Sequence, residues 1–118
     1  MFDRIVGVVL WTDNIQRLKE FYRDILGLQL HSERSNFVAF ALGNERLSIG
    51  LHDSVSGHAK DPFRIMINLG VADIANVFRQ LKERGVQFIR EPEKEHWGGW
   101  VATLCDPDGN ILQLLEQP

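Results

Sequence analysis

Apolar positions along the first half of the chain predict a strand, a helix and three further strands. A β-branched run at residues 5–11 is short enough for a buried strand. Apolar residues then recur at helical spacing over residues 15–25, and Gly27 is placed to end that helix. Asp13 is predicted to cap it, with Gln16 completing a capping box. The strands predicted next are residues 28–33, 37–42 and 46–52.

The second half repeats this order after a small, polar stretch at residues 53–62 that is typical of a linker. Asp73 is predicted to cap a second amphipathic helix, and Gly85 is predicted to end it. The turn Asp106–Gly109 is predicted to join the last two strands. The strands predicted in this half are residues 63–70, 86–90, 100–105 and 110–116.

The two halves align with an offset of 59 residues over the first strand and the helix, so that Leu10 matches Leu69 and Ile15 matches Ile74. The alternative is that any two amphipathic helices after strands look alike, but the helix ends and one turn also correspond. We therefore predict a true repeat of a βαβββ unit. The prediction is a single α+β domain over residues 1–118, with module one at about 4–52 and module two at about 63–116.

Composition limits the class of protein. The chain has 118 residues, 44% of them hydrophobic and 25% charged, with a formal net charge of −3. Such a chain has enough apolar surface to fold, and its mild acidity predicts binding to neither nucleic acid nor an anionic membrane. One Cys excludes an internal disulfide framework. With no long apolar span and no signal-peptide pattern, we expect a cytoplasmic protein.

The segments Thr12–Ile15, Phe21–Tyr22, Leu26–Leu28, Gly98–Gly99 and Asp106–Asn110 resemble the vicinal oxygen chelate superfamily. This superfamily contains glyoxalase I, the extradiol dioxygenases and the bleomycin-resistance binding proteins. The resemblance covers about residues 4–116. It implies two βαβββ modules whose curved mixed sheets enclose a cavity, with the helices outside, and often a homodimer. It does not fix a function, because the family carries out unrelated chemistry on one scaffold.

Metal-dependent members of that superfamily carry ligands on the first and last strand of each module. The resemblance assigns these positions to Gly7, Ser48, Met66 and Gln113, where a divalent ion would find few of the donors it prefers. We therefore predict that the metal centre is absent and that no cofactor is bound. In the alternative, His52 and Gln113 hold an ion together with a neighbouring acid.

Strand alternation predicts which side chains line the cavity. The lining is mainly apolar with a few polar groups, as in many small-molecule pockets. Trp97 is predicted either to cover the ligand as a lid or to pack on a dimer partner or on the helix of module one. In a second alternative the side chains fill a closed sheet, and Asn68 and Gln113 satisfy each other. The predicted ligand-binding residues are Trp11, Ser48, His52, Arg64, Met66, Asn68, Trp97 and Gln113.

Few residues are candidates for catalysis. His52 and His96 are the weak candidates for an acid or a base. Cys105 is predicted to pack as a small apolar residue, because no His or acid is spaced to activate it. Tyr22 and Trp100 are predicted to pack rather than to bind ligand.

The leading functional hypothesis is metal-independent binding of a small, partly aromatic molecule in the sheet cavity of a homodimer. Arg64 would favour an anionic or carbonyl-bearing ligand. The alternative from another class is a divalent-metal-dependent lyase, isomerase or dioxygenase with a rearranged metal site. A third hypothesis is a structural or regulatory dimer whose cavity is filled by its own side chains.

Overall fold

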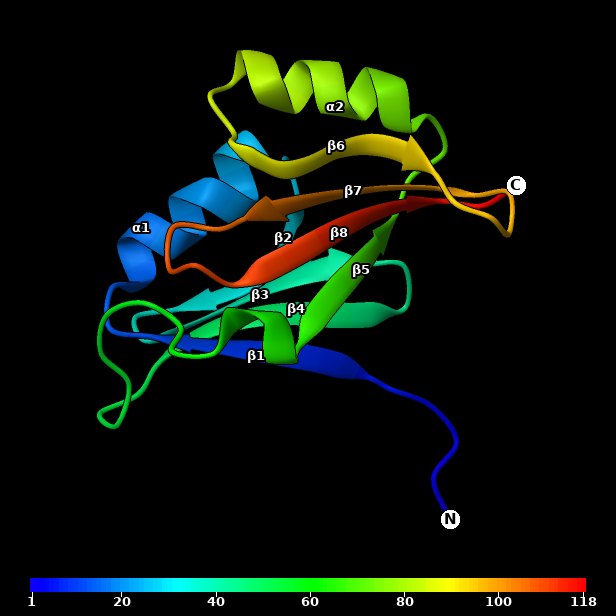
Figure 1. The fold of residues 1–118 in the computed structure, drawn as a ribbon. Coiled ribbons are helices and arrows are strands. Elements are labelled where there is room, and N and C mark those ends of the chain that lie inside the picture. Colours follow the sequence, from blue (N-terminus) through cyan, green and yellow to red (C-terminus); the bar gives the residue numbers. More distant parts are fainter. The chain divides into compact units, whose positions relative to one another are not determined.

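Each half of the chain folds into a four-stranded mixed sheet with a helix on one face (Figure 1). The computed structural model describes residues 1–118 and divides into two compact units, Met1–Gly57 and His58–Pro118. The boundary lies inside the predicted linker. The two units have the same element order, which confirms the predicted α+β class and the βαβββ repeat. Their joining into one domain around a cavity stays a prediction.

Unit 1 has the strand order β1-β4-β3-β2, in which β1 and β4 are parallel and the other neighbours are antiparallel. The helical part is an α-helix that continues directly into a π-helical turn. The predicted strand at residues 37–42 is confirmed, and the other strands agree to within two residues at each end. The elements are β1 (Gly7–Thr12), α1 (Ile15–Glu20), η1 (Phe21–Ile25), β2 (Gln29–Arg34), β3 (Phe37–Leu42) and β4 (Glu45–Leu51).

The core of unit 1 forms where the helical segment meets one face of this sheet. Leu18 and Tyr22 are fully buried, and the Tyr22 ring lies 6.4 Å from the ring of Phe40 on β3. Phe40 and the buried Ile49 of β4 point to this helix-covered face. Burying such side chains contributes about 1.5–3 kcal/mol each. Residues that alternate with them therefore point to the opposite face of the sheet.

The cap of α1 differs from the prediction. Asn14, not Asp13, caps the helix, and its side-chain oxygen accepts from the backbone N–H of Arg17 at 3.2 Å. The Asp13 carboxylate instead accepts from the backbone N–H of Gly57 at 2.9 Å, which ties the chain after β4 to the start of the helix. Gln16 donates one turn further along the helix, so no capping box forms. Asp and Asn both suit an N-cap, and the contact of Asp13 with the loop leaves the cap to Asn14.

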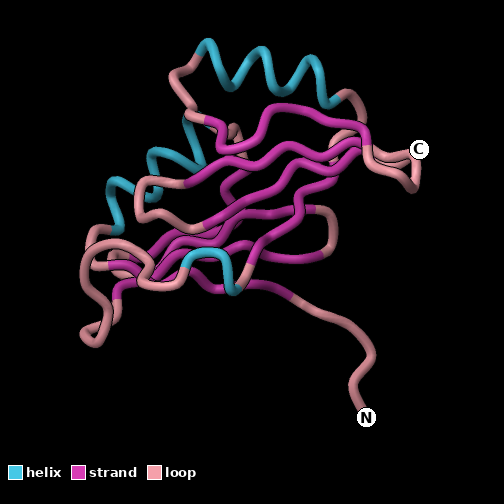
Figure 2. Tube along the Cα trace, viewed as in Figure 1, coloured by secondary structure: helices cyan, strands magenta, loops and turns pink.

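Unit 2 repeats the topology with the order β5-β8-β7-β6, and β5 is parallel to β8. Figure 1 shows α2 running along one face of this sheet, and Figure 2 separates its helices from its strands by colour. The predicted strand at residues 100–105 is confirmed. The elements are η2 (Pro62–Arg64), β5 (Met66–Gly70), α2 (Ile74–Glu83), β6 (Phe88–Lys94), β7 (Trp100–Cys105) and β8 (Ile111–Glu116).

The predicted ends of α2 are confirmed. The Asp73 carboxylate accepts from the backbone N–H of Asn76 at 3.1 Å, as an N-cap does. Gly85 has a φ of 88°, the left-handed conformation that ends many helices. Between these ends Phe78 packs edge-on against Phe88 of β6, with ring centroids 4.7 Å apart. The helix is thereby fixed to its own sheet.

The first strand of unit 2 begins three residues later than predicted. Pro62 opens a short 3₁₀ turn instead, because its fixed φ suits a first helical position. Arg64 lies in this turn and pairs with Asp61 at 2.8 Å, with its side chain exposed. Arg64 therefore does not alternate with Met66 and Asn68 on one strand face, which corrects that interpretation.

The turn between β7 and β8 depends on one buried carboxylate. Asp106 is 4% exposed, and its Oδ1 accepts from the backbone N–H groups of Asp108 at 2.8 Å and Asn110 at 3.0 Å. Its Oδ2 accepts from the Asn110 side-chain amide at 2.8 Å. Gly109 supplies the positive φ, at 83°. The predicted turn is confirmed, and it aligns β8 between its two neighbours.

No helix of the structure has the length and the apolar character needed to cross a membrane.

Candidate functional site

The open face of the unit 1 sheet, opposite α1, carries three of the predicted ligand-binding or metal-position residues in register. Strand pairing sets up three rows of residues across β1, β4 and β3. Paired residues in a sheet point to the same face, so each row forms one strip of this surface. The rows are Gly7, Arg46 and Ala41; then Val9, Ser48 and Ala39; then Trp11, Gly50 and Phe37.

Aromatic rings gather at one end of this face. The Trp11 ring lies 5.3 Å from the ring of His52, edge-on, and 6.1 Å from the ring of Phe37. Gly50 lies beneath them, and a Cβ there would come within 2.5 Å of the indole and 2.9 Å of the Phe37 ring. Trp11 is nevertheless 43% exposed. We name Trp11, Phe37, His52 and Gly50 the aromatic cluster. It offers a flat apolar wall to a ligand.

Sequence reasoning identified Trp11 and His52 but not Phe37 or the role of Gly50. The signal was present in the alternation of β3, where Phe37 shares a face with Ala39 and Ala41. The importance of Gly50 was not visible, because it depends on where the Trp11 ring lies.

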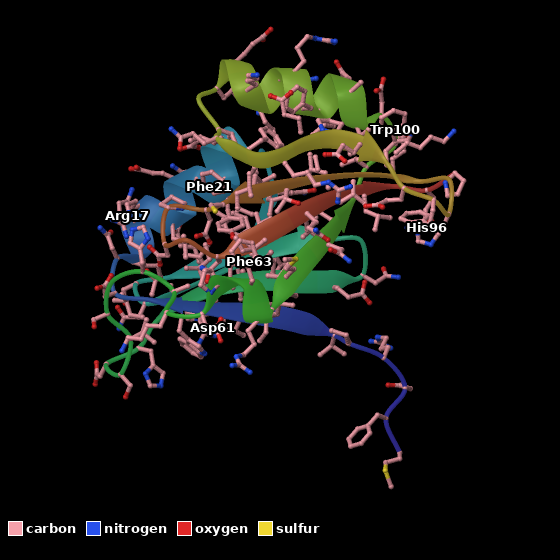
Figure 3. The ribbon with its side chains drawn as sticks, in the orientation of Figure 1. Arg17, Phe21, Asp61, Phe63, His96 and Trp100 are labelled. Atoms are coloured by element: carbon pink, nitrogen blue, oxygen red, sulfur yellow. The ribbon has the colours of Figure 1, made fainter.

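The two histidines named as candidate acids or bases have different surroundings. His52 Nδ1 accepts from the backbone N–H of Ser54 at 3.0 Å, so the proton of the neutral ring is on Nε2. His96 is exposed in the loop between β6 and β7 (Figure 3). The neighbouring Glu95 pairs with Arg90 at 2.8 Å. Neither imidazole has the carboxylate partner that orients a typical general base.

The positions that the resemblance assigns to metal ligands do not fit a divalent ion in unit 1. A Cβ at Gly7 would lie 2.7 Å from the backbone carbonyl of Arg46, so β1 and β4 approach too closely there for a ligand side chain. Ser48 is 6% exposed and offers only a hydroxyl. Arg46 adds a positive charge to the same face, which repels a cation.

The corresponding positions of unit 2 offer little more. Met66 supplies a thioether, a poor ligand for hard ions. The Gln113 amide donates to Thr103 Oγ1 at 3.3 Å. No group of three His, Cys, Asp or Glu side chains in the chain is arranged to hold a metal ion. We derive no chemistry through a metal from this donor set.

A polar row crosses the whole sheet of unit 2. Asn68 on β5 is in register with Gln113 on β8, Thr103 on β7 and Arg90 on β6. Gln113 donates to Thr103 rather than satisfying Asn68, which is exposed. Hydrogen bonds first to Glu95 and then to Glu93 raise the pKa of Arg90. The sequence analysis did not single out Arg90, which the strand register places in this row.

The tryptophans of unit 2 lie near the loop that joins β6 and β7. The Trp97 ring lies over Gly99, where it occupies the space that a side chain at this position would need. Trp97 is 42% exposed, and Trp100, at the start of β7, is 37% exposed. Figure 3 shows Trp100 at the same end of the unit as His96. The predicted lid function of Trp97 stays a prediction.

Two hollows open on unit 1. One, of about 420 Å³, lies between α1 and the β2–β3 hairpin, where Lys19 pairs with Glu33. The hydrogen bond from Lys19, and then its charge, lower the pKa of the Glu33 carboxyl. The other, of about 430 Å³, lies along β1 beside Arg46. Its lining residues are Val6, Gly7, Val8, Val9, Asn44, Arg46 and Ser48.

The lone cysteine is expected to react slowly. Burial raises the pKa of the Cys105 thiol above its ordinary value, and the charge of the adjacent Asp106 raises it further. Only the thiolate is nucleophilic, so alkylation by iodoacetamide should be slow at neutral pH and reach its half-maximal rate at a higher pH than in the unfolded chain. A time course followed by mass spectrometry measures this, with the urea-unfolded chain as the fast control. Equal rates for folded and unfolded protein at neutral pH would contradict it.

The paired βαβββ units and their open sheet faces define a class of fold that serves both binding proteins and enzymes. Residues 4–114 match the family model of the Glyoxalase/Bleomycin resistance protein/Dioxygenase superfamily, and the chain belongs to that superfamily. The predicted resemblance is confirmed.

Individual relatives support the same assignment. A bleomycin resistance protein of Klebsiella pneumoniae is 40% identical over 55 residues, which are 41% of this chain and 44% of that protein, so the match spans less than half of its length. A crystal structure of a protein of unknown function from Agrobacterium tumefaciens str. C58 has a TM-score of 0.83 at 27% identity, covering 100% of this chain and 97% of that one. A lactoylglutathione lyase from Agrobacterium tumefaciens, with a TM-score of 0.77 and 18% identity over 96% of this chain and 92% of that one, shares the fold.

Proposed function

We propose that the chain binds a small, partly aromatic molecule on the open face of the unit 1 sheet and that no divalent ion takes part. The aromatic cluster carries this proposal, because Trp11 is held between Phe37 and His52 yet keeps 43% of its surface exposed. Rings fixed in this way lose little conformational entropy when they stack on a ligand. The bleomycin resistance protein among the relatives agrees with a binding role.

The donors of this face support independence from metal. Gly7 has no space for a ligand side chain, and Arg46 places a positive charge beside it. His52 Nδ1 is occupied by a backbone N–H. A metal-dependent lyase, isomerase or dioxygenase would need these groups to rearrange. The binding function needs no rearrangement.

The ligand contacts proposed within unit 1 are Trp11, Ser48 and His52. Met66, Asn68 and Gln113 remain predicted contacts from the unit 2 sheet, and Arg64 and Trp97 stay predictions without further support. A homodimer and a cytoplasmic location also remain predictions.

Replacing Trp11 tests the proposal. A panel of neutral, cationic and anionic aromatic compounds is titrated into EDTA-treated protein and followed by tryptophan fluorescence and by the indole N–H signals in NMR spectra. We expect saturable binding that moves the Trp11 signal, and a loss of affinity of about tenfold or more in Trp11→Ala.

Trp100→Ala is the matched control, because it removes an indole that is 37% exposed and lies on the other unit. Its affinity should equal that of the wild type. The proposal would be overturned if Trp11→Ala left the ligand affinity unchanged, or if binding required added Zn²⁺, Mn²⁺, Fe²⁺ or Ni²⁺.

A further inference from the structure

The open face of unit 1 has a positively charged side chain, Arg46, at the end away from the aromatic cluster. Arg46 lies in the row of Gly7, four residues along β4 from Gly50 in the aromatic cluster. With about 3.3 Å of rise per strand residue, the two rows are about 13 Å apart. The hollow of about 430 Å³ lies beside Arg46 and is bounded by the apolar residues Val6 and Val9.

Arg46 has no acidic partner, unlike Arg4, Arg23, Arg64 and Arg90. Its guanidinium is half-buried and donates to one neutral acceptor, the backbone carbonyl of Glu45, at 3.1 Å. The carboxylate of Glu45 is directed to Arg4, at 3.9 Å. The acid-paired arginines elsewhere are Arg23 with Asp24, Arg64 with Asp61, and Arg90 with Glu93 and Glu95.

A half-buried guanidinium with one neutral acceptor has unused donors and an uncompensated charge. A planar oxyanion satisfies both, because a carboxylate accepts two parallel N–H bonds from the guanidinium fork. The Ser48 hydroxyl and the Asn44 side chain line the same hollow and add neutral hydrogen-bonding groups. Gly7, which has no side chain, lines the hollow next to Arg46.

We propose that Arg46 binds the carboxylate of the ligand, so that the site takes an aryl carboxylate whose ring lies against the aromatic cluster. This inference rests on the proposed function and names its ligand class. One guanidinium balances the single charge of a carboxylate but leaves a phosphate dianion half compensated. Because the two rows are about 13 Å apart, the ligand needs a short spacer between its carboxylate and its ring.

The test compares three probes that share a phenyl ring: phenylpropionate, its neutral amide phenylpropionamide, and phenyl phosphate. Each is titrated into EDTA-treated protein, with the Trp11 indole and Arg46 side-chain N–H signals as readouts. We expect phenylpropionate to bind about tenfold or more tightly than the amide, since hydrogen bonds between charged groups are the stronger ones.

Three variants assign that preference to Arg46. Arg46→Gln should remove the preference for the acid and leave amide binding unchanged, and Arg46→Lys should restore part of it, since the charge remains but the fork is lost. Arg79→Gln, on the exposed side of α2, removes an equal charge and should change nothing.

Equal binding of acid and amide, unaffected by Arg46→Gln, would overturn this inference and leave the proposed function intact. Tighter binding of phenyl phosphate that depends on Arg46 would overturn the carboxylate class. No response of Trp11 or Arg46 to any of the three probes at millimolar concentration would also overturn it, and the wider aromatic panel then decides the proposed function separately.

Discussion

Gly50→Ala is expected to destabilise the protein by about 1–3 kcal/mol and to abolish binding at the aromatic cluster. A Cβ at this position would come within 2.5 Å of the Trp11 ring and 2.9 Å of the Phe37 ring, so at least one ring must move. Both rings belong to the proposed binding surface. Urea unfolding measures the loss of stability, and the indole signal of Trp11 reports the displacement.

Gly70→Ala is the matched control for this change. Gly70 also lies in a strand with an ordinary φ, but a Cβ there meets no atom within 4 Å. Its alanine variant should be neutral or more stable by up to about 1 kcal/mol, because alanine restricts the unfolded chain. Similar stabilities for the two variants would show that the rings are not packed on Gly50 as described.

Asp106→Ala should have the largest effect on stability, about 3 kcal/mol or more. The buried carboxylate accepts from two backbone N–H groups and from the Asn110 amide. Removing it leaves these donors without their acceptor in a buried turn, and their desolvation is then uncompensated. The change in the urea midpoint at constant slope is the measurement.

Two further variants define the cause. Asp106→Asn keeps one acceptor oxygen but points an amide toward the Asn110 amide, so it should lose part of the stability. Asp53→Ala removes an exposed acid and should stay within about 0.5 kcal/mol of the wild type. A loss in Asp106→Ala no larger than that in Asp53→Ala would contradict the role given to this turn.

The fold could be predicted because residues at the ends of the helices are recognisable in the sequence. Asp73 and Gly85 mark the ends of α2 in the sequence, and the structure places both at those ends. Gly27, with a φ of 76°, marks the end of the first helical segment in the same way. These residues act through the backbone next to them, so spacing along the chain is sufficient to predict them.

Errors occurred where a specific side-chain contact or a proline, rather than hydrophobic periodicity, decided between local alternatives. Asp13 and Asn14 are both good caps, and the backbone of Gly57, 44 residues away, takes the Asp13 side chain. Arg64 looked like a strand residue by alternation, but Pro62 turns the chain and Asp61 pairs with it. No periodicity argument contains these contacts.

Only part of the candidate site was predicted, because alternation along one strand is visible in the sequence and the pairing between strands is not. Trp11 and Ser48 were identified from strand alternation, which fixes the face of a side chain. Phe37 and Arg46 acquire their importance from strand register, since pairing places them beside Gly50 and Gly7. Register is a property of two strands together, and a single strand does not reveal it.

The central claim is that a small aromatic ligand binds without a divalent ion. Calorimetry tests it most directly, by titrating EDTA-treated protein with Zn²⁺, Mn²⁺, Fe²⁺ and Ni²⁺ in turn and then titrating a ligand from the panel with and without each ion. We predict no saturable binding of any ion and the same ligand affinity in every case. Binding of one ion per chain with a micromolar or lower Kd, together with ligand binding only to the ion-loaded protein, would contradict the account.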